Sequence, residues 1–417
     1  MLDGVKMGRF LAAKRKEAKM TQQQLAERLH VSFQAVSKWE SGATYPSLET
    51  LHDLAVALHV SADDILAGGH KAGEALSYSK AGVDIAYTDS IKQAMAGYLQ
   101  TPDRRVLNGL GPFAALYDIQ FPSMEEPVLA LKSEEPGSKQ KLAMEYGFTE
   151  SICYDMINHL VNDIVVMGAR PLAVLDCIVC GNAEKDTIQT LVRGIADACR
   201  QNECSLVGGE TSIQPAVVAP GTYVLTSSIV GIVERKKIVD GSAIRPGDAV
   251  LAVASNGLHT NGYSLVRLLM ERMPQIKLDR VDGITFLEQI MKPHTAYYKG
   301  LKGLLGDPAL HGMAHITGGG LAGNLSRVIP AGLSAQIDLS KIRPLPIFRA
   351  IKEYGSIEED EMLRTFNCGV GFVLVVAPQE KRRVMEHMEA WYPCYEIGRI
   401  AEGEAAVQCF NRLDWVQ

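Results

Sequence analysis

In the first seventy residues the apolar positions recur with the period of short amphipathic helices. A capping box at Thr21-Gln-Gln-Gln24 starts one helix, because the threonine accepts from the backbone and the last glutamine reaches back. Ser32 is a good N-cap for the next helix, which has Val36 and Trp39 on one side and small polar residues on the other. Two short helices joined by a tight turn predict a helix-turn-helix, within an all-α domain at residues 1–69.

Beyond this domain the pattern changes to apolar, strand-like runs that alternate with helical stretches. Strands interleaved with helices indicate an α/β or α+β body. A glycine-rich joint at residues 67–73 precedes the body, and a turn-rich joint at 240–248 divides it into halves at 70–240 and 241–417. The strand-like runs lie at residues 127–131, 171–179, 205–208, 223–233, 249–254 and 371–376, and the helical stretches include 155–167 and 187–201.

The composition is that of a soluble globular protein, with 47% hydrophobic and 22% charged residues among 417. We find no apolar run of transmembrane length and no signal peptide, so a cytoplasmic protein without a membrane role is expected. The eight cysteines include one C-x-x-C, Cys177-Ile-Val-Cys180, which lies in an apolar run and favours a core role over metal or redox chemistry. A net charge of -6 argues against a nucleic-acid coat but not against a local basic patch.

The stretch from His315 to Pro330 contains three consecutive glycines, Gly318, Gly319 and Gly320, just before an apolar periodic run. Backbone N–H groups without neighbouring side chains can approach a phosphate where a helix begins. Thr317 adds a hydroxyl, and we expect Pro330 to end the helix. A flexible glycine turn is an equally good interpretation of the triplet alone.

Further segments of the body combine glycines, acids and hydroxyls. Gly109 and Gly111 lie in a backbone-exposing loop, and the turn from Glu134 through Ser138 to Lys139 suits Mg²⁺ together with phosphate oxygens, although a solvated turn fits equally. Asp163 falls in an apolar helix, where a carboxylate needs a cation or donor, and Glu210 follows a strand. A donor-rich loop after the run at 249–254 adds Asn256, His259, Asn261 and Ser264.

The first domain resembles the DNA-binding domain of the Cro/C1 (XRE-type) repressor family in Thr21-Gln-x-x-Leu25-Ala26, Val31-Ser32, Val36-Ser37-x-Trp39-Glu40-x-Gly42 and Pro46-Ser47. The resemblance implies a double-stranded DNA operator bound by a dimer on two half-sites. A helical domain that binds protein is the alternative, since residues 1–69 carry eight basic and eight acidic side chains. By the resemblance, Ser32, Phe33, Gln34, Ser37 and Lys38 face the major groove and Lys14, Arg15, Lys16 and Arg28 contact phosphates.

The order of motifs in the body resembles the phosphoribosylformylglycinamidine cyclo-ligase family over roughly residues 77 to 400. The resemblance implies two α/β halves and a homodimer whose strands form a shared β-barrel. It also implies ATP- and Mg²⁺-dependent ring closure of a purine-pathway ribonucleotide. The motifs are Ala81-Gly-Val-Asp-Ile85, Gly109-Leu-Gly111, Val161-Asn-Asp163, Leu206-Val-Gly-Gly-Glu-Thr211, Gly257-Leu-His-Thr-Asn-Gly-Tyr-Ser-Leu-Val-Arg267, His315-Ile-Thr-Gly-Gly-Gly320 and Glu361-Met-x-Arg-Thr-Phe-Asn-Cys-Gly-Val-Gly371.

Carried over by residue, the resemblance implies three kinds of site. The catalytic residues are Lys139, Asp163 and Glu210, with Asp163 and Glu134 holding Mg²⁺. ATP is held by Gly109, Gly111, Glu134, Ser138 and Lys139. The ribonucleotide is held by Asn256, His259, Asn261, Ser264, Thr317, Gly318, Gly319 and Gly320.

The chain departs from the family mainly in the nucleotide half. The family's Asp-Gly-Val-Gly-Thr-Lys is Glu134-Glu-Pro-Gly-Ser-Lys139 here, and its His-Asp-Thr is Thr149-Glu-Ser151, whereas the substrate half is nearly intact. Two hypotheses follow: an active cyclo-ligase with an added DNA-binding domain, or a transcription regulator whose body senses a purine intermediate or nucleotide. Another ATP-using relative, such as a selenophosphate synthase or thiamine-phosphate kinase, is disfavoured by the segments at 257–267 and 364–367.

Overall fold

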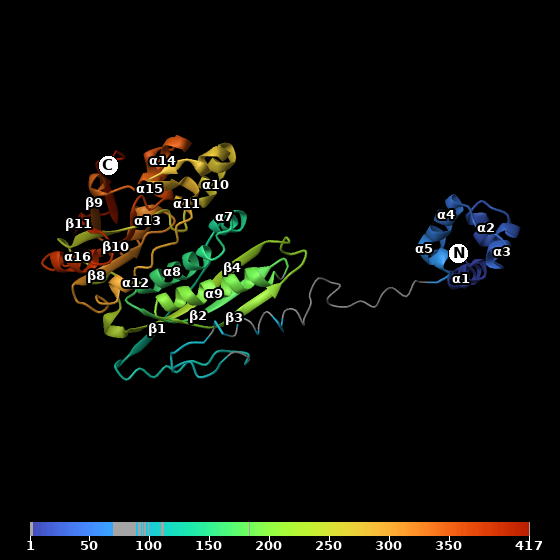
Figure 1. The fold of residues 1–417 in the computed structure, drawn as a ribbon, viewed down its shortest axis with the longest axis horizontal. Helices are drawn as coiled ribbons and strands as arrows, with labels where there is room; N and C mark the ends of the chain where they lie inside the picture. The colour runs from blue at the N-terminus through green and yellow to red at the C-terminus, as the bar shows by residue number, and fades with distance from the viewer. Residues whose placement is uncertain are drawn as a thin grey trace. The chain divides into compact units, whose positions relative to one another are not determined.

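The computed structural model describes residues 3–69, 89–90, 93, 95, 97–98, 100–109, 112–182 and 184–416. The chain divides into two compact units, Met1–Ala81 and Gly82–Gln417, which are drawn in Figure 1. The predicted boundary at residue 69/70, the end of the glycine-rich joint and the motif at 81–85 lie partly or wholly outside the described residues. The exact domain boundary therefore stays a prediction.

The first unit is all-α, as predicted, with its own apolar core around Leu25, Val36 and Trp39. Thr21 and the glutamine three residues later form the expected capping box, and Ser32 Oγ accepts from the Ala35 N–H at 3.2 Å. These two caps start the two helices of the helix-turn-helix. The helices are α1 (Gly4–Glu17), α2 (Gln22–Arg28), α3 (Phe33–Glu40), α4 (Leu48–Leu58) and α5 (Ala62–Ala67).

The first half of the body is a four-stranded sheet in the order β1-β4-β2-β3. Only the β2–β3 pair is parallel, and β4 runs antiparallel to both of its neighbours. The helices α8 and α9 pack on one face of this sheet (Figure 1). The elements are β1 (Pro127–Glu134), α7 (Lys139–Tyr146), α8 (Ser151–Val165), β2 (Arg170–Cys180), α9 (Lys185–Gln201), β3 (Ser205–Ile213), β4 (Tyr223–Glu234) and a short 3₁₀ turn, η1 (Arg235–Lys237).

The second half contains a six-stranded sheet in the order β12-β9-β11-β5-β10-β8. The central pair, β5 (Ala249–Ala254) and β10 (Val370–Val376), is antiparallel and almost wholly buried, which explains why both strands read as continuous apolar runs. The remaining strands, which the sequence analysis did not identify, are β8 (Leu310–His315), β9 (Leu333–Asp338), β11 (Cys394–Glu402) and β12 (Val407–Phe410), with a separate small ribbon of β6 (Arg280–Val281) and β7 (Ile284–Thr285).

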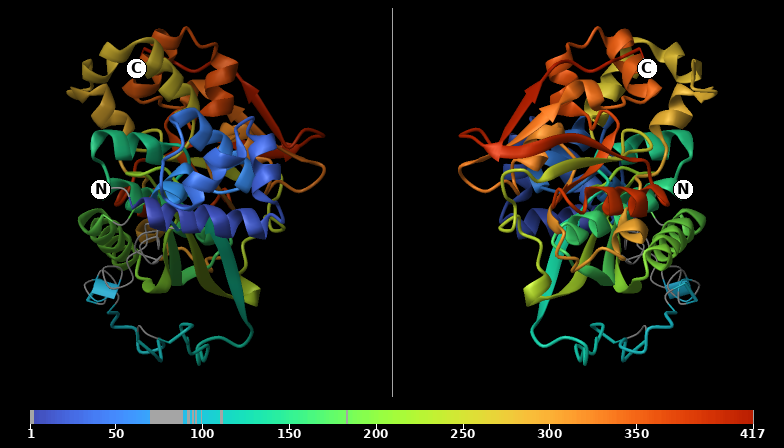
Figure 2. Two further views of the ribbon diagram at one scale, coloured as in Figure 1. Left: turned by 90° about the vertical axis from the view of Figure 1, so that its right-hand side faces the viewer. Right: turned by 90° about the vertical axis from the view of Figure 1, so that its left-hand side faces the viewer.

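Most helices of the second half, among them α10, α11, α14 and α15, lie at the end of the body away from β2 and β3, as the yellow and orange ribbons of Figures 1 and 2 show, whereas α12 contacts α8. They contact one another in the pairs α10–α14, α11–α14, α13–α15 and α14–α15, while α16 packs on β5 and β11. Their bounds are α10 (Tyr263–Arg272), η2 (Pro274–Leu278), α11 (Phe286–Ile290), α12 (Tyr298–Leu301), α13 (Gly320–Leu325), η3 (Leu339–Lys341), α14 (Pro346–Gly355), α15 (Glu359–Thr365) and α16 (Lys381–Glu389).

Both sheets of the body are open, so the chain by itself does not support the expected β-barrel. One face of the four-stranded sheet carries exposed apolar side chains, among them Leu129, Leu131 and Leu175. Phe121 packs against Ile232 on this face and covers only part of it. Among the described residues, no helix combines the length and the apolar character needed to cross a lipid bilayer.

Candidate functional site

Three loops of the second half meet where that half contacts α8. A Cβ atom on Gly262 would lie 2.1 Å from the Phe366 ring, and one on Gly318 would lie 3.4 Å from Asn261 Oδ1. The loops after β5, after β8 and before β10 are therefore in direct contact. Glycine is required at 262, where φ is 79° and the backbone passes against an aromatic ring. The sequence motifs at 257–267, 315–320 and 361–371 thus form one continuous surface.

The glycine triplet forms a short loop that Asn324 holds in place. The Asn324 side-chain amide donates to the carbonyls of Thr317, Gly318 and Gly320, and its oxygen accepts from the Thr317 hydroxyl at 3.2 Å. Gly318 and Gly319 are exposed. The helix that follows, α13, ends at Leu325, so the expectation that it reaches Pro330 was wrong. Apolar residues beyond Leu325 pack in turns rather than in a continued helix.

His259 lies in a strained and buried position at the centre of the loops. Its φ is 61°, its side chain is fully buried, and neither ring nitrogen has a hydrogen-bond partner among the residues that the structure describes. A Cβ on Gly371 would lie 2.6 Å from this ring and 1.9 Å from the Tyr297 hydroxyl. The glycine at 371 therefore makes room for the imidazole, and burial lowers the pKa of His259 well below its usual range.

Asp163 on α8 is the most strongly paired acid of this region. Its carboxylate accepts from His315 Nδ1 at 2.7 Å and lies 3.0 Å from Lys132 Nζ, which confirms that this carboxylate has both a donor and a cation beside it. Burial alone would raise the pKa of Asp163, but the bond from His315 and the nearby positive charges outweigh it and hold that pKa well below 3.8. Asp163 is therefore ionised at neutral pH.

Lys132 links the two acids that the sequence analysis assigned to Mg²⁺. Its Nζ lies 2.9 Å from Glu134 Oε2 and 3.0 Å from Asp163 Oδ2. An ammonium group thus stands between the carboxylates, where a divalent cation would need oxygen ligands at about 2.0–2.1 Å. As arranged, these residues do not fit Mg²⁺, and a metal ion at this pair would have to displace Lys132.

Lys139 points into the protein. Its side chain is fully buried, and its three N–H groups donate to Asp155 Oδ1 at 2.8 Å, to the His259 carbonyl at 3.1 Å and to the Lys292 carbonyl at 2.7 Å. No proton of this ammonium group remains for a phosphate oxygen. Burial raises the pKa of Asp155 to about 6 and lowers the pKa of Lys139, while their mutual attraction opposes both shifts.

His159, one turn before Asp163 on α8, faces the same acids. Its Nε2 lies 3.6 Å from Asp163 Oδ2, and its Nδ1 lies 3.1 Å from Thr260 Oγ1. Burial, together with the neighbouring His315, lowers the pKa of His159 to about 4, so its ring is neutral at pH 7. The site therefore combines the carboxylates of Asp163 and Glu134 with the partly exposed ammonium of Lys132 and the neutral imidazole of His159.

Comparison with known proteins identifies the body. Residues 115–233 match the family "AIR synthase related protein, N-terminal domain", and residues 245–409 match its C-terminal counterpart. The chain is 41% identical over 332 residues to the phosphoribosylformylglycinamidine cyclo-ligase of Bacillus cytotoxicus, covering 78% of this chain and 96% of that protein. The corresponding enzyme of Bacillus thuringiensis is 40% identical over the same lengths. The chain belongs to the phosphoribosylformylglycinamidine cyclo-ligase family.

Membership in this ligase family confirms the predicted family and the expectation of an enzyme. Residues 11–65 match the helix-turn-helix family, so the fusion of the two parts is also confirmed. Among solved structures, E. coli HypE is similar over 78% of this chain and 94% of its own, with a TM-score of 0.57 and 16% identity. Thiamine-monophosphate kinase from Stenotrophomonas maltophilia covers 80% and 98%, with a TM-score of 0.54 and 19% identity. These two likenesses show the fold alone.

Some residues expected from the cyclo-ligase family are not brought to the cluster around Asp163. Glu210 pairs in register with Cys177 on β2, so it points away from the sheet face that α8 covers. Gly109 is exposed in a loop that Asn108 closes through its bonds to residues 114 and 116. Gly111 lies outside the described residues. Their proposed roles in catalysis and ATP binding stay predictions.

The remaining expected residues line the neighbouring surface. Ser138 precedes α7 and is half-buried, while Ser264 is exposed in the first turn of α10. Asn256 is exposed and donates to the Pro293 carbonyl at 2.8 Å. It lines a cavity of about 460 Å³ together with His294. Neither Ser138 nor Ser264 lines this cavity, so Asn256 is the member of this group that reaches it.

The second helix of the helix-turn-helix, α3, presents the predicted DNA-reading residues to solvent. Ser32, Phe33, Gln34 and Lys38 are exposed and Ser37 is half-buried, whereas Val36 and Trp39 face the core. One predicted phosphate contact was wrong. Arg15 is buried and donates to both Glu40 oxygens, at 2.5 and 2.9 Å, and to the Met20 carbonyl at 2.7 Å. It braces α1 against α3 instead of reaching DNA.

Sequence reasoning missed Lys132, His159 and His294. Lys132 lies on the inward face of β1 together with Val128 and Ala130. A charged residue on an otherwise apolar strand face was a signal that the sequence contained. His159 stands four residues before Asp163, which is the spacing of one helix face. His294 lies in a loop without any local pattern, and only the packing of the two halves brings it to the cluster.

Proposed function

We propose that the chain catalyses ATP-dependent cyclisation of formylglycinamidine ribonucleotide to aminoimidazole ribonucleotide. The observation that carries this proposal is the meeting of the three substrate-half loops beside the ionised Asp163. In the proposed reaction ATP phosphorylates an amide oxygen, because that oxygen is a poor leaving group, and the amine nitrogen then closes the ring as phosphate departs. Exposed backbone at Gly318 and Gly319 would bind the phosphate of the ribonucleotide.

The polar groups around Asp163 can serve this reaction without further residues. Lys132 keeps 38% of its side chain exposed, so its ammonium can meet the negative charge that develops on a transferring phosphoryl group. Asp163 holds that ammonium and His315 in fixed orientations. Lys139 would have a positioning role, because its bonds to Asp155 and to two loop carbonyls join α7 and α8 to the substrate loops.

The test is formation of ADP and aminoimidazole ribonucleotide by the purified chain, supplied with formylglycinamidine ribonucleotide, ATP and Mg²⁺. Asp163→Asn should lower kcat by at least about 100-fold, because the Lys132 ammonium and the His315 imidazole lose the carboxylate that holds both of them. Asp186→Asn is the matched control, since Asp186 is exposed in the first turn of α9. If the Asp163→Asn variant turns over as fast as the parent, Asp163 has no role in catalysis.

A sensor function is the second candidate, and the internal pairing of the nucleotide-half residues favours it. Lys139 donates its three N–H groups inside the protein, and the Lys132 ammonium lies between the carboxylates of Glu134 and Asp163. A regulator would bind the ribonucleotide or nucleotide with little turnover and change its affinity for DNA. No product after extended incubation, together with saturable ligand binding by calorimetry, would decide for the sensor.

We propose that α3 reads an operator in double-stranded DNA and that the body forms the homodimer such a domain requires. The exposed apolar side chains of the four-stranded sheet support a second copy as the partner of that face, since large apolar patches mark interfaces. Two open sheets joined through these faces would provide the shared barrel that the single chain lacks. ATP is the proposed nucleotide, and the solved structure of HypE in complex with ATP is a fold relative that binds it.

A further inference from the structure

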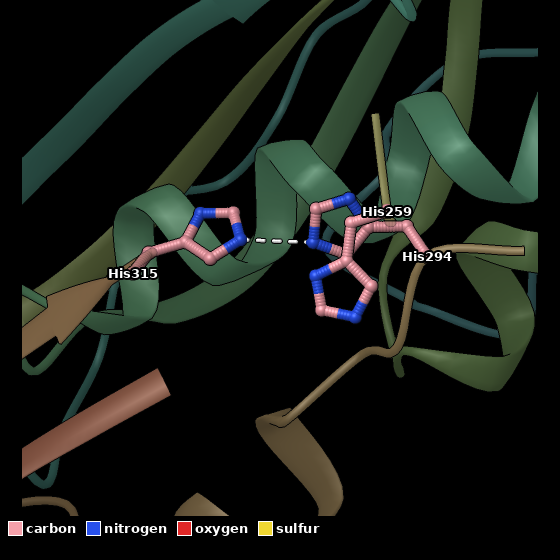
Figure 3. Close-up of side chains that lie close together, drawn as sticks. All are labelled: His259, His294 and His315. Atoms are coloured by element: carbon pink, nitrogen blue, oxygen red, sulfur yellow. Dashed lines mark hydrogen bonds between the residues drawn. The ribbon is translucent and has the colours of Figure 1, made fainter. Parts of the chain in front are cut away.

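Four histidines from distant parts of the sequence converge at the boundary between the two halves. His159 comes from α8, His259 from the loop after β5, His294 from the loop before α12 and His315 from the end of β8. The ring centroids of His294 and His315 are 4.9 Å apart, and those of His159 and His315 are 5.1 Å apart. Figure 3 shows His315 facing the stacked rings of His259 and His294.

The hydrogen bond from Asp163 determines which nitrogen of His315 faces that centre. An ionised carboxylate only accepts, so the 2.7 Å contact places a proton on His315 Nδ1. His315 Nε2 then carries the lone pair and lies 2.9 Å from His294 Nε2 (Figure 3). A carboxylate bonded to the outer nitrogen of a histidine is the usual support of a metal-binding imidazole.

The environment of His294 leads to the same conclusion. Its Nδ1 lies 3.4 Å from Thr260 Oγ1, so Nε2 is the nitrogen turned to the centre. Two nitrogens at 2.9 Å need either a proton or a metal ion between them. A His294 proton on Nε2, with Nδ1 accepting from the Thr260 hydroxyl, is one such arrangement, and a metal ion bound by both Nε2 atoms is the other.

His259 supplies the second, independent observation. Its ring stacks on His294 with centroids 3.9 Å apart, it is fully buried, and within the described part of the chain both of its nitrogens lack a hydrogen-bond partner. Buried polar atoms are rarely left without a partner. One nitrogen each from His259, His294 and His315 lies within 4.8 Å of the other two, so a single ion can reach all three once the His259 ring turns out of its stack on His294.

We propose that His259, His294 and His315 bind one divalent transition-metal ion of the Zn²⁺ class, with Asp163 orienting His315. Imidazole nitrogens suit Zn²⁺, Co²⁺, Ni²⁺ or Cu²⁺, whereas Mg²⁺ prefers oxygen ligands. Three histidines leave a fourth position for water or a ligand atom. The site adjoins the acidic pair with Lys132 through Asp163, and metal binding can be measured without cyclo-ligase turnover. His259 then acts as a metal ligand rather than as a direct substrate contact.

The metal would also join the two halves of the body. Thr260 Oγ1 contacts Nδ1 of both His159 and His294, and the His294 backbone N–H donates to Asp155 on α8. A metal ion at the histidines would therefore hold the substrate loop after β5 against α8. Metal bound only by the folded state should raise Tm, with a shift that grows with metal concentration.

The experiment uses the full chain, stripped of metal with a chelator and titrated with Co²⁺, because Co²⁺ bound by nitrogen ligands absorbs visible light. We expect one equivalent of Co²⁺ with a visible band, displacement by Zn²⁺ but not by excess Mg²⁺, and one Zn²⁺ per chain by elemental analysis. His294→Gln and His315→Gln should abolish the band. Asp163→Asn should weaken binding about 10–100-fold, as loss of a carboxylate behind a metal-bound histidine does.

His311→Gln is the matched control, because His311 Nδ1 contacts Asp248 at 2.7 Å in the same way but is not a member of the histidine cluster. This variant should keep the band. The absence of a Co²⁺ band in the parent chain overturns the proposal whatever the variants do, and leaves a proton between the two rings. A band that persists in both His294→Gln and His315→Gln, or disappears in His311→Gln, also overturns it. Circular dichroism of every variant establishes that each is folded.

Discussion

Lys139 and Asp155 form a fully buried ion pair, with Nζ 2.8 Å from Oδ1 and neither side chain exposed. The same ammonium group reaches the carbonyls of His259 and Lys292, so it joins α7 and α8 to two loops of the second half. Lys139 lies in a sequence of the phosphate-binding type, but its ammonium group bonds to groups inside the protein. Removal of either charge leaves the other buried without an opposite charge beside it.

We predict that Lys139→Met lowers the free energy of unfolding by about 3–5 kcal/mol, as breaking a buried ion pair does. The double variant Lys139→Met/Asp155→Leu should regain most of this loss, because no unpaired charge remains. Denaturant unfolding measures both, with Lys341→Met as an exposed control. Unchanged stability combined with lost ATP binding would instead place Lys139 at the phosphates.

Gly371→Ala should disrupt the histidine cluster. The added Cβ would meet the Tyr297 hydroxyl at 1.9 Å and His259 at 2.6 Å, so one of these rings must move. Overpacking of this kind costs about 1–3 kcal/mol, and we expect the Co²⁺ band and the turnover to fall together. Gly323→Ala is the control, because nothing lies within 4 Å of its added methyl group. Full metal binding by the Gly371→Ala chain would contradict the placement of His259.

The ion pair of Arg15 with Glu40 should make the first domain sensitive to acid. Burial would raise the pKa of Glu40, but hydrogen bonds from Arg15 and Gln22 outweigh it and keep that pKa below 4.5. A depressed carboxylate pKa stabilises the fold above about pH 4.5, and this contribution disappears as the pH falls through the folded-state pKa. The hydrogen-exchange protection factors of the α3 amides should therefore fall as the pH is lowered through the folded-state pKa of Glu40.

Glu40→Gln provides the control for this pH dependence. The variant should be less protected than the parent at pH 7, and the difference between the two should shrink as the pH is lowered, since protonated Glu40 no longer attracts Arg15. An equal difference at neutral pH and at a pH well below the folded-state pKa would show that the ionised pair makes no contribution.

Gln34→Ala should weaken binding to the operator DNA by about 1–3 kcal/mol without altering nucleotide or metal binding. Gln34 is an exposed amide on α3, and it has the donor and the acceptor that adenine requires. Fluorescence anisotropy at fixed salt measures the affinity. His52→Ala on the exposed side of α4 is the control. Loss of nucleotide binding in step with DNA binding would refute the modular organisation.

Leu131→Arg should dissociate the proposed homodimer. Leu131 is 71% exposed on the open face of the four-stranded sheet, and a buried arginine without a partner is costly at an apolar interface. Leu278→Arg is the matched control, since Leu278 is 70% exposed but lies in η2. Sedimentation velocity should show a monomer for the first variant only. A parent chain that sediments as a monomer would refute the proposed homodimer.

The sequence by itself determined the local structure and the family. Capping at Thr21 and Ser32 depends on residues within three positions, and the strand runs at β2, β4, β5 and β10 follow from their own apolar content. Such signals are short-range, so they can be read without the fold. Helix α13 was overextended because apolar periodicity does not distinguish a helix from packed turns.

Only the tertiary structure decided what the polar side chains face. Alternation along β3 places Glu210 on one face, but which face α8 covers depends on long-range packing. Lys139 looked suited to phosphates until its three partners, two of them carbonyls from beyond residue 250, were known. The four histidines lie up to 156 positions apart, from His159 to His315, and no local pattern links them. Their meeting depends on the docking of the two halves, which local propensity does not encode.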